Sequence, residues 1–315
     1  MRVVFMGTPE FSVGTLKALK EAGHEIVAVI TQPDKPKGRG KAMQYTEVKE
    51  EALKLFLPVL QPVKVREAAF IEELRGFEPD VIVVVAFGQI LPKEILEMPK
   101  YGCVNVHASL LPKYRGAAPI QWAVIDGEKV SGVTTMKMDV GLDTGDMIEK
   151  TEIVLDEKET GGSLHDKLSE AGAKLCVHTL ELLEQGKATF TKQDDSLSCY
   201  AKMLHKQLGN LDFTKSAAEL ERLIRGLNPW PSAYSFLHGK TVKIWEAEVR
   251  QQEGVCATPG VITEVESDAI CVQTGDGILA IRELQMEGKK RMDAGAFLRG
   301  YTIEKGEHFM ERKDV

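Results

Sequence analysis

Residues 80–88 read DVIVVVAFG, and this stretch is the strongest indication of the fold class because every position from Val81 to Val85 is aliphatic. A strand that is apolar on both faces is typical of the centre of a parallel sheet with helices on each side. Two strands are expected before it, RVVFM and EIVAVIT, and one after it, CVNVH. Helix-like segments alternate with these strands, which indicates a doubly wound, Rossmann-like α/β domain with a mostly parallel sheet.

The ends of two helices in this domain can be predicted from single residues. Thr8 is expected to cap the first helix, with Pro9 at its first position. A long helix is expected from about residue 163 because leucines recur at helical spacing as far as Leu183. Gly186 can end this helix, so we place the first domain at residues 1–186.

The pattern changes after Gly186. Residues 187–208 are polar and poorly periodic, which is typical of a linker. A short helix is expected next, where Ser216 and Glu219 have the spacing of a capping box. From Ala233 onward, five short strand-like segments alternate with turn signals such as HG and GDG. This pattern predicts a small antiparallel barrel, with an OB-like β-barrel as the first hypothesis, in a second domain at 209–315.

The bulk composition excludes several classes of protein. The 315 residues carry a net charge of −7, which argues against non-specific nucleic-acid binding over the whole surface but leaves a local basic patch open. The longest apolar run, VIVVVAF, is far too short to cross a bilayer, and the N-terminus resembles no secretory signal. Five scattered cysteines without a C-x-x-C pair indicate reduced thiols in a cytoplasmic protein and give no zinc pattern.

An asparagine and a histidine interrupt the strand CVNVH. Because residues i and i+2 of a strand share a face, Asn105 and His107 point together while Val104 and Val106 can pack on a helix. His107 lies near the carboxyl end of the strand, where open α/β sheets bind ligands. An amide beside an imidazole can stabilise an oxyanion and move protons, as acyl transfer requires. A simple turn cap is the competing interpretation, and residue type alone favours it.

A histidine in such a role needs an acceptor to orient it. The Gly-rich segment MDVGLDTGDM offers Asp139, Asp143 and Asp146. Each of these acids taken singly is more often a turn or cap residue than a catalytic one. Their spacing does not fit an EF-hand loop, so no metal is expected. Cys103 is expected to be a small hydrophobic residue of the core.

A basic segment, PDKPKGRGKAM, follows the second strand. A solvated surface loop is its ordinary interpretation. However, the segment begins on the same carboxyl edge as Asn105 and His107, where a basic loop can bind phosphate groups. Its basic residues are Lys35, Lys37, Arg39 and Lys41.

A second basic cluster is expected on the barrel. It consists of Lys289, Lys290 and Arg291, and with Lys206 and Arg225 it can follow a nucleic-acid backbone. Trp230, in the sequence NPWP, is expected to be a packing anchor for the domain junction and not a platform for base stacking.

Taken together, these motifs resemble the methionyl-tRNA formyltransferases. The motif NVH-x-SLLP-x-x-RG-x-x-P with a downstream D-x-G-x-DTG is specific to formyltransferases that use 10-formyltetrahydrofolate. One departure is Ala108, where glycine is expected. The first βα turn lacks G-x-G-x-x-G, which disfavours a dinucleotide. The matching segments run in order across nearly the whole chain: FMGTPEFS, TQPDKPKGRGK, VVAFGQILP, NVHASLLPKYRGAAPIQWAVIDGE, GVTTMKMDVGLDTGDMI and GLNPWPSAYS.

The resemblance implies an enzyme that transfers the formyl group of 10-formyltetrahydrofolate to the α-amino group of methionyl-initiator-tRNA, for translation initiation. Asn105 and His107 would stabilise the oxyanion, and Asp143 would pair with His107 and set its charge state. No metal and no tightly bound cofactor are implied, because the folate is a co-substrate, and a monomer is expected. The folate site would be formed by two segments: Phe87, Gly88, Gln89, Ile90 and Leu91, and Ser109, Leu110, Leu111 and Pro112.

The resemblance also implies that the basic loop binds the acceptor stem of the tRNA, with Arg39 at the position of the family's arginine. The main alternative is a formyltransferase that acts on an amino sugar nucleotide, against which KGRGK and NPWPSA count. Glycinamide ribonucleotide formyltransferases lack the basic loop and the second domain. A formyltetrahydrofolate hydrolase and a non-catalytic RNA-binding protein are further alternatives. The intact Asn105, His107 and Asp143 argue against the RNA-binding protein.

Overall fold

The computed structural model describes residues 1–37, 42–251 and 257–310. The chain forms two compact units. The first contains residues 1–119, 130–154 and 165–201, and the second contains residues 120–129, 155–164 and 202–315. The described part of the chain contains no helix that is both long enough and apolar enough to span a membrane.

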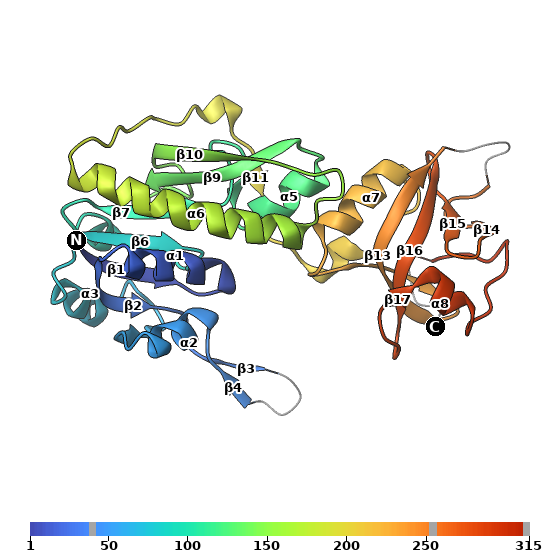
Figure 1. Cartoon of the computed structure of the whole chain (residues 1–315), viewed down its shortest axis with the longest axis horizontal. Helices are drawn as coiled ribbons and strands as arrows, with labels where there is room; N and C mark the ends of the chain where they lie inside the picture. Colours follow the sequence, from blue (N-terminus) through green and yellow to red (C-terminus); the bar gives the residue numbers. More distant parts are fainter. Residues whose placement is uncertain (38–41, 252–256, 311–315) are drawn as a thin grey trace. The chain divides into compact units, whose positions relative to one another are not determined.

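The first unit is built on a seven-stranded sheet with the order β10-β9-β7-β6-β1-β2-β5 (Figure 1). β6 is the central strand and all five of its residues are buried. It pairs in parallel with β1 and β7, whereas β9 runs antiparallel to β7 and β10. The mostly parallel sheet predicted from DVIVVVAFG is therefore confirmed. The strands are β1 (Arg2–Gly7), β2 (Glu25–Ile30), β5 (Val59–Leu60), β6 (Val81–Val85), β7 (Cys103–His107), β9 (Val130–Lys137) and β10 (Asp146–Val154).

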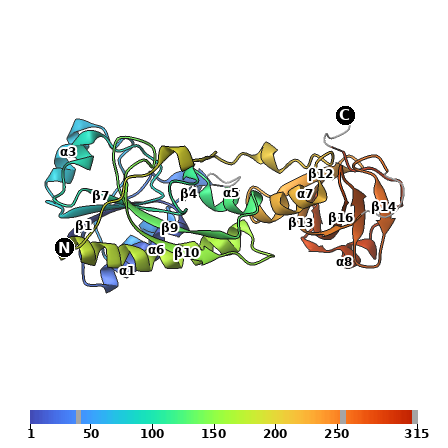
Figure 2. The ribbon, with the colours of Figure 1, turned by 90° about the horizontal axis from the view of Figure 1, so that it is seen from above.

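Helices cover both faces of this sheet. α1 and α6 lie on the same face (Figure 2), and the hydroxyl of Ser169 in α6 donates to the carbonyl of Phe11 in α1. Gly172 lets α6 approach β7 closely, because a Cβ there would lie 2.9 Å from a methyl of Val106. On the other face, α3 and α4 pack on alternate residues of β1, β2 and β6. The helices are α1 (Glu10–Glu21), α2 (Glu47–Lys54), α3 (Ala68–Arg75), α4 (Lys93–Leu96) and α6 (Gly161–Glu184).

Short elements complete the first unit. Two of them pair in parallel, β8 and β11, and this pairing joins the segment after β7 to the segment after α6. The short elements are β3 (Lys35–Lys37), β4 (Ala42–Gln44), β8 (Arg115–Gly116), the 3-10 helix η1 (Asp195–Leu197) and β11 (Tyr200–Ala201).

One helix-end prediction is confirmed and one is wrong. Gly186 follows α6 with φ +66°, and its N–H donates to the carbonyl of Leu183. Thr8 does not cap α1; its hydroxyl donates to the carbonyl of Phe87 at 3.2 Å instead. The hydroxyl of Thr8 therefore stabilises the segment after β6 and not the first turn of α1.

The second unit contains an antiparallel sheet with the order β12-β13-β16-β15-β14, and β17 pairs with β16. α7 begins with the expected capping box between Ser216 and Glu219. Of α5, only Pro119 belongs to the first unit. The elements are α5 (Pro119–Ile125), η2 (Lys206–Gly209), α7 (Ala217–Gly226), β12 (Ala233–Leu237), β13 (Lys240–Arg250), β14 (Ile262–Val265), β15 (Ile270–Gln273), β16 (Ile278–Met286), β17 (Met292–Asp293) and α8 (Ala294–Leu298).

Residues 307–310 join the two edges of this sheet. The N–H of Met310 donates to the carbonyl of Phe236 in β12 at 2.9 Å. At the other edge, the N–H of Ile262 in β14 donates to the carbonyl of Glu307 at 2.8 Å. Closure of a sheet removes the unpaired backbone groups of its edge strands. The predicted small antiparallel barrel is therefore confirmed.

Two early segments of the chain pack within the second unit. Arg222 of α7 donates from Nε to the carbonyl of Ile125 at 3.1 Å, and Arg225 donates to the carbonyl of Glu159 at 2.7 Å. Gly161 and Gly226 allow a close backbone approach, because a Cβ on Gly161 would lie 2.4 Å from the carbonyl oxygen of Gly226.

Residues 187–208, which the sequence suggests as a linker, are divided between the two units at residue 201. Trp230, which is expected to be a packing anchor at the domain junction, has an exposed fraction of 56%.

The capping box of α7 gives a stability prediction. Ser216→Ala removes the hydroxyl that accepts from the Glu219 N–H at 3.2 Å, and the second unit should lose about 1 kcal/mol of unfolding free energy. Trp122, Trp230 and Trp245 all lie in the second unit, so tryptophan fluorescence in a urea titration measures this loss.

The same variant should show a pH dependence. The hydrogen bond from the Ser216 hydroxyl lowers the pKa of Glu219 in the folded protein. The corresponding stability is present above the ordinary value of 4.5 and is lost as the pH falls through the folded pKa, so the difference between the two proteins should narrow in acid. Ser267→Ala, at an exposed serine of the same unit, is the matched control. Equal midpoints for Ser216→Ala and the wild type at neutral pH would contradict the prediction.

Candidate active site

The structure places Asn105 and His107 side by side on β7. Asn105 lies between Val84 of β6 and Met136 of β9, and Val106 packs against α6 on the opposite face. The two polar side chains therefore leave the sheet together near its carboxyl edge, as the two-residue period of a strand requires. Asn105 is half-buried, and His107 is buried.

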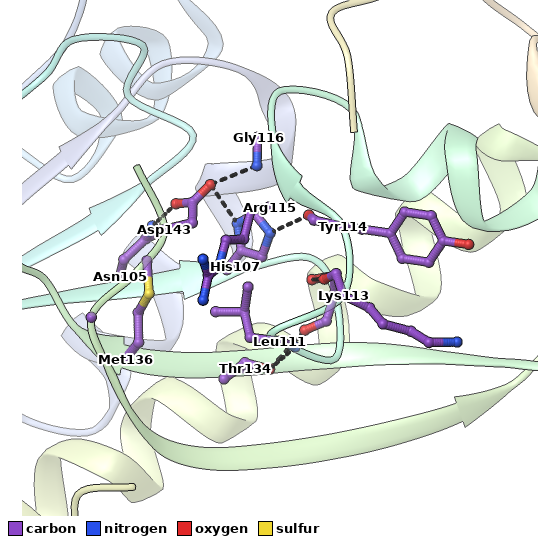
Figure 3. A network of polar contacts seen from close by, with 12 residues as sticks. Asn105, His107, Leu111, Lys113, Tyr114, Arg115, Gly116, Thr134, Met136 and Asp143 are labelled. Carbon is purple, nitrogen blue, oxygen red and sulfur yellow. Dashed lines mark hydrogen bonds and ion pairs between the residues drawn. The ribbon is translucent and has the colours of Figure 1, made fainter. Parts of the chain in front are cut away.

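The carboxylate of Asp143 meets both of these side chains (Figure 3). Its Oδ2 lies 3.7 Å from Nδ1 of His107 and accepts the backbone N–H of Gly116 at 2.8 Å. Its Oδ1 lies 3.5 Å from Nδ2 of Asn105. The Asp143 side chain is only 11% exposed, so these groups replace most of its water. Of the three acids in the Gly-rich segment, Asp143 is the one that the fold brings to His107.

The hydrogen bonds of His107 define its orientation. Nε2 lies 2.9 Å from the carbonyl oxygen of Tyr114. A carbonyl oxygen can only accept, so Nε2 carries a proton and donates it to this bond. Nδ1 is then the ring nitrogen that faces Asp143, and it can exchange a proton on that side. The imidazole is held between a backbone acceptor and a carboxylate, which is the arrangement expected for general acid–base chemistry.

Asp139 has a local role in the same loop. Its Oδ1 accepts the N–H of Gly141 at 3.0 Å and the hydroxyl of Thr144 at 2.6 Å, which makes it a turn residue. Asp146 is the first residue of β10.

The segment Ser109, Leu110, Leu111 and Pro112 is fixed to β9. Thr134 donates its hydroxyl proton to the carbonyl of Ser109 at 2.7 Å and accepts the N–H of Leu111 at 3.1 Å. Lys150 donates to the carbonyl of Leu111 at 2.5 Å, and burial lowers the pKa of its ammonium group. Because Ser109 and Leu111 are themselves buried, their side chains set the shape of the loop.

The segment Phe87, Gly88, Gln89, Ile90 and Leu91 follows β6 at the same edge. The carbonyl of Phe87 accepts from Thr8 at 3.2 Å and from Gln32 at 3.1 Å. Gly88 has φ +83°, a conformation that favours glycine. The Gln89 side chain accepts the N–H of Val65. Ile90 is 81% exposed, so this loop presents an apolar side chain to solvent beside a fixed backbone.

Comparison with known proteins decides the family. The protein-family model described as "Formyl transferase" matches residues 1–180, and the family model "Formyl transferase, C-terminal domain" matches residues 203–302. A methionyl-tRNA formyltransferase of Lachnospira eligens is 61% identical over 97% of this chain and 98% of its own length. Another, of Agathobacter rectalis, is 61% identical over 98% of this chain and 99% of its own length. The chain belongs to the methionyl-tRNA formyltransferase family.

A solved structure with the same fold has a much lower sequence identity to this chain than these relatives have. The N-formyltransferase of Helicobacter canadensis, solved with folinic acid and dTDP-3-aminofucose, is 18% identical. It superposes with a TM-score of 0.66 over 89% of this chain and 99% of its own. At this identity the likeness concerns the fold alone.

The structure describes only part of the basic loop in this member of the methionyl-tRNA formyltransferase family. Lys35 is exposed at the start of β3, and Lys37 is the last residue of that strand. Arg39 and Lys41 lie outside the described residues. The base of the hairpin is held by Asp34, whose carboxylate accepts from Lys49 at 2.5 Å and from Gln61 at 2.7 Å. The bond from Lys49 lowers the pKa of Asp34, so this anchor stays charged at neutral pH.

The basic residues of the second unit have different surroundings. Lys206, Lys289 and Lys290 are exposed. The guanidinium group of Arg291 lies 4.7 Å above the ring of Trp245 and pairs with Glu283.

Arg225, in contrast, pairs with Glu221 and donates to the carbonyl of Glu159, so it supports the packing of α7.

Cys103 is fully buried, and burial raises the pKa of its thiol to about 12, which agrees with its expected role as a core residue.

Within residues 1–37, 42–251 and 257–310, no group of three or more His, Cys, Asp and Glu side chains is placed to hold a metal ion.

Several residues at the site are not predicted from the sequence. Thr134, Gly116 and Gln193 all contact the loops around Asp143 and His107. Gly116 has φ +109°, and a Cβ there would lie 2.8 Å from the carbonyl oxygen of Ala201. The RG in the sequence is only a weak indication that Gly116 has a role at the site. Nothing in the sequence indicates such a role for Gln193, because it lies in a polar segment without periodicity.

Proposed function

We propose that this chain transfers the formyl group of 10-formyltetrahydrofolate to the α-amino group of methionyl-initiator-tRNA. The observation that carries the proposal is the convergence of Asn105, His107 and Asp143 at the carboxyl edge of the sheet, in a chain of this family. An amide donor, an imidazole and a carboxylate are the groups that formyl transfer between two nitrogens requires.

The reaction forms one C–N bond and breaks another. The α-amino nitrogen attacks the formyl carbon, and the carbonyl oxygen becomes an oxyanion. Nδ2 of Asn105 donates a hydrogen bond to this oxyanion. The attacking amine loses a proton to Nδ1 of His107, and the protonated Nδ1 can then donate to the oxyanion as well. The C=O bond re-forms as the bond from carbon to N10 of the folate breaks, and N10 takes the proton from His107. Asp143 pairs with His107 and sets its charge state.

The two folate segments and the basic residues complete the proposal. The backbone of residues 87–91 and the fixed loop 109–112 hold the folate, which is a co-substrate, with no metal and no tightly bound cofactor. Residues 1–186 act as the catalytic domain and 209–315 as the tRNA-binding domain, joined by 187–208. Lys35, Lys37, Arg39 and Lys41 bind the acceptor stem, and Lys206, Lys289, Lys290 and Arg291 follow the tRNA backbone. We propose that the enzyme works as a monomer in the cytoplasm.

A direct assay distinguishes this function from its alternatives. The protein is mixed with 10-formyltetrahydrofolate and, separately, with methionyl-initiator-tRNA, an amino sugar nucleotide, glycinamide ribonucleotide, or water alone. Formyl transfer to methionyl-tRNA only is the expected result, measured by acid-stable formylmethionine on the tRNA. Transfer to the sugar nucleotide, or release of formate without an acceptor, would refute the proposal.

Removal of the oxyanion donors should lower turnover strongly. Asn105→Ala and His107→Ala should each reduce kcat by about 10²–10³-fold because one stabilising donor is lost. Asp143→Asn should also reduce kcat, since it removes the charge that faces His107. Asp139→Asn is the matched control on the same loop, and its kcat should remain close to that of the wild type. Near-normal turnover of either alanine variant, with the fold intact by circular dichroism, would exclude the assigned site.

The basic loop should contribute mainly to tRNA binding. Arg39→Ala should raise the KM for methionyl-tRNA and make the salt dependence of tRNA binding less steep, because one phosphate contact is lost. The KM for 10-formyltetrahydrofolate should not change. Lys54→Ala, which removes an exposed cation of α2, serves as the control. Unchanged use of methionyl-tRNA by Arg39→Ala at physiological salt would remove Arg39 from the tRNA site.

A further inference from the structure

Gln193 lies in the polar segment after α6, and the proposed mechanism does not use it. Its side-chain amide contacts the Asp143 loop at two points. Nε2 donates to the carbonyl of Asp143 at 2.8 Å and to the carbonyl of Gly145, also at 2.8 Å. Both protons of the NH2 group are therefore used on the loop that carries the carboxylate facing His107.

The other atom of the same amide contacts the loop after β7. Oε1 of Gln193 accepts from Nε of Arg115 at 3.0 Å. The next residue, Gly116, donates its N–H to the Asp143 carboxylate. One side chain thus connects the loop that carries Asp143 with the turn that orients its carboxylate.

The backbone of Asp143 needs such support. Its φ is +54°, in the left-handed region that favours glycine. Non-glycine residues keep this conformation only when their surroundings hold it in place. Two hydrogen bonds to the carbonyls at positions 143 and 145 fix the peptide groups on this strained turn. If they are lost, the loop can relax and move the carboxylate away from His107.

The segment that carries Gln193 is itself anchored. β11 pairs with β8, the N–H of Ala117 donates to the carbonyl of Ala201 at 2.9 Å, and Arg115 pairs with Asp195 at 2.8 Å. Gln193 is half-buried within this arrangement. The amide is therefore delivered from a fixed backbone and not from a free chain.

We propose that Gln193 is a positioning residue that holds the Asp143 carboxylate against His107 during formyl transfer. The proposal rests on the proposed function, because it assumes that Asp143 acts in catalysis. Gln193 touches neither the reacting atoms nor His107, and it acts through the loop. Its chemistry fits the task, since a glutamine amide has two donors for the two carbonyls and one acceptor for the guanidinium group.

Two substitutions separate the donor role from the acceptor role. Gln193→Ala removes the bonds to Asp143, Gly145 and Arg115. Gln193→Glu keeps the acceptor for Arg115 but places a carboxylate against two carbonyl oxygens, so the donors are lost. Both variants should lower kcat by about 10²-fold, with the KM for each substrate close to the wild-type value, because a displaced carboxylate affects the transition state and not binding. Ser196→Ala, in the same segment and hydrogen-bonded to Asp194 outside the Asp143 loop, should leave kcat unchanged.

A double-mutant cycle with Asp143→Asn gives a readout that a general loss of stability would not produce. If Gln193 acts through Asp143, adding Gln193→Ala to Asp143→Asn should cause little further loss of kcat. Melting temperatures of all variants are measured in parallel.

The outcomes are distinct. Full activity of Gln193→Ala, or additive losses in the cycle, would overturn the role of Gln193 while leaving formyl transfer intact. Wild-type activity of Gln193→Glu would show that only the contact to Arg115 matters, and it would also overturn the proposed role of Gln193 in holding the Asp143 loop. Absence of transfer to methionyl-tRNA by the wild-type chain would instead overturn the proposed function.

Discussion

The site depends on how one buried carboxylate is held. Burial of a charged group is unfavourable unless hydrogen bonds or an opposite charge compensate for the lost water. Asp143 receives a backbone N–H from Gly116 at 2.8 Å and faces the imidazole of His107 and the amide of Asn105. These partners come from the strands β7 and β8, whereas the carboxylate itself comes from the loop before β10. The carboxylate can be placed there only when all three segments have their final geometry.

The fixed loops around this carboxylate give the site its rigidity. Thr134 hydrogen-bonds the carbonyl of Ser109 and the N–H of Leu111 in the loop after β7. Lys150 donates to the carbonyl of Leu111. In the segment after the neighbouring strand β6, the carbonyl of Phe87 accepts from both Thr8 and Gln32. A site whose loops are fixed before the substrate arrives loses less conformational entropy when it binds and reacts. Most of these bonds use backbone carbonyls, so their geometry follows from the fold of the sheet edge.

Much of the sheet and part of the site could be predicted from local pattern. The aliphatic run of β6 predicts a central strand, and the period of two places Asn105 and His107 on one face. The choice of Asp143 among three nearby acids could not come from spacing, because it depends on where the loop returns to β7. Gln193 could not be predicted for a similar reason. It lies in a segment without periodicity, and the residues that it contacts are far from it in the sequence. Thr8 has the residue type of a helix cap, but the carbonyl of Phe87 lies within its reach and accepts its proton.

The packing of residues 120–129 and 155–164 within the second unit has a consequence for how the chain folds during synthesis. Both segments leave the ribosome before α7, whose Arg222 and Arg225 hydrogen-bond their carbonyls. Domains generally fold in the order in which they are translated, and surfaces without their partners at that stage are open to misassembly. The nascent sheet of the first unit can therefore begin to form around β6 while these two segments still lack their partners in α7, which lie 97 residues after Ile125 and 66 residues after Glu159. A pause in translation between β10 and α7 would lengthen the interval in which a chaperone has to cover them.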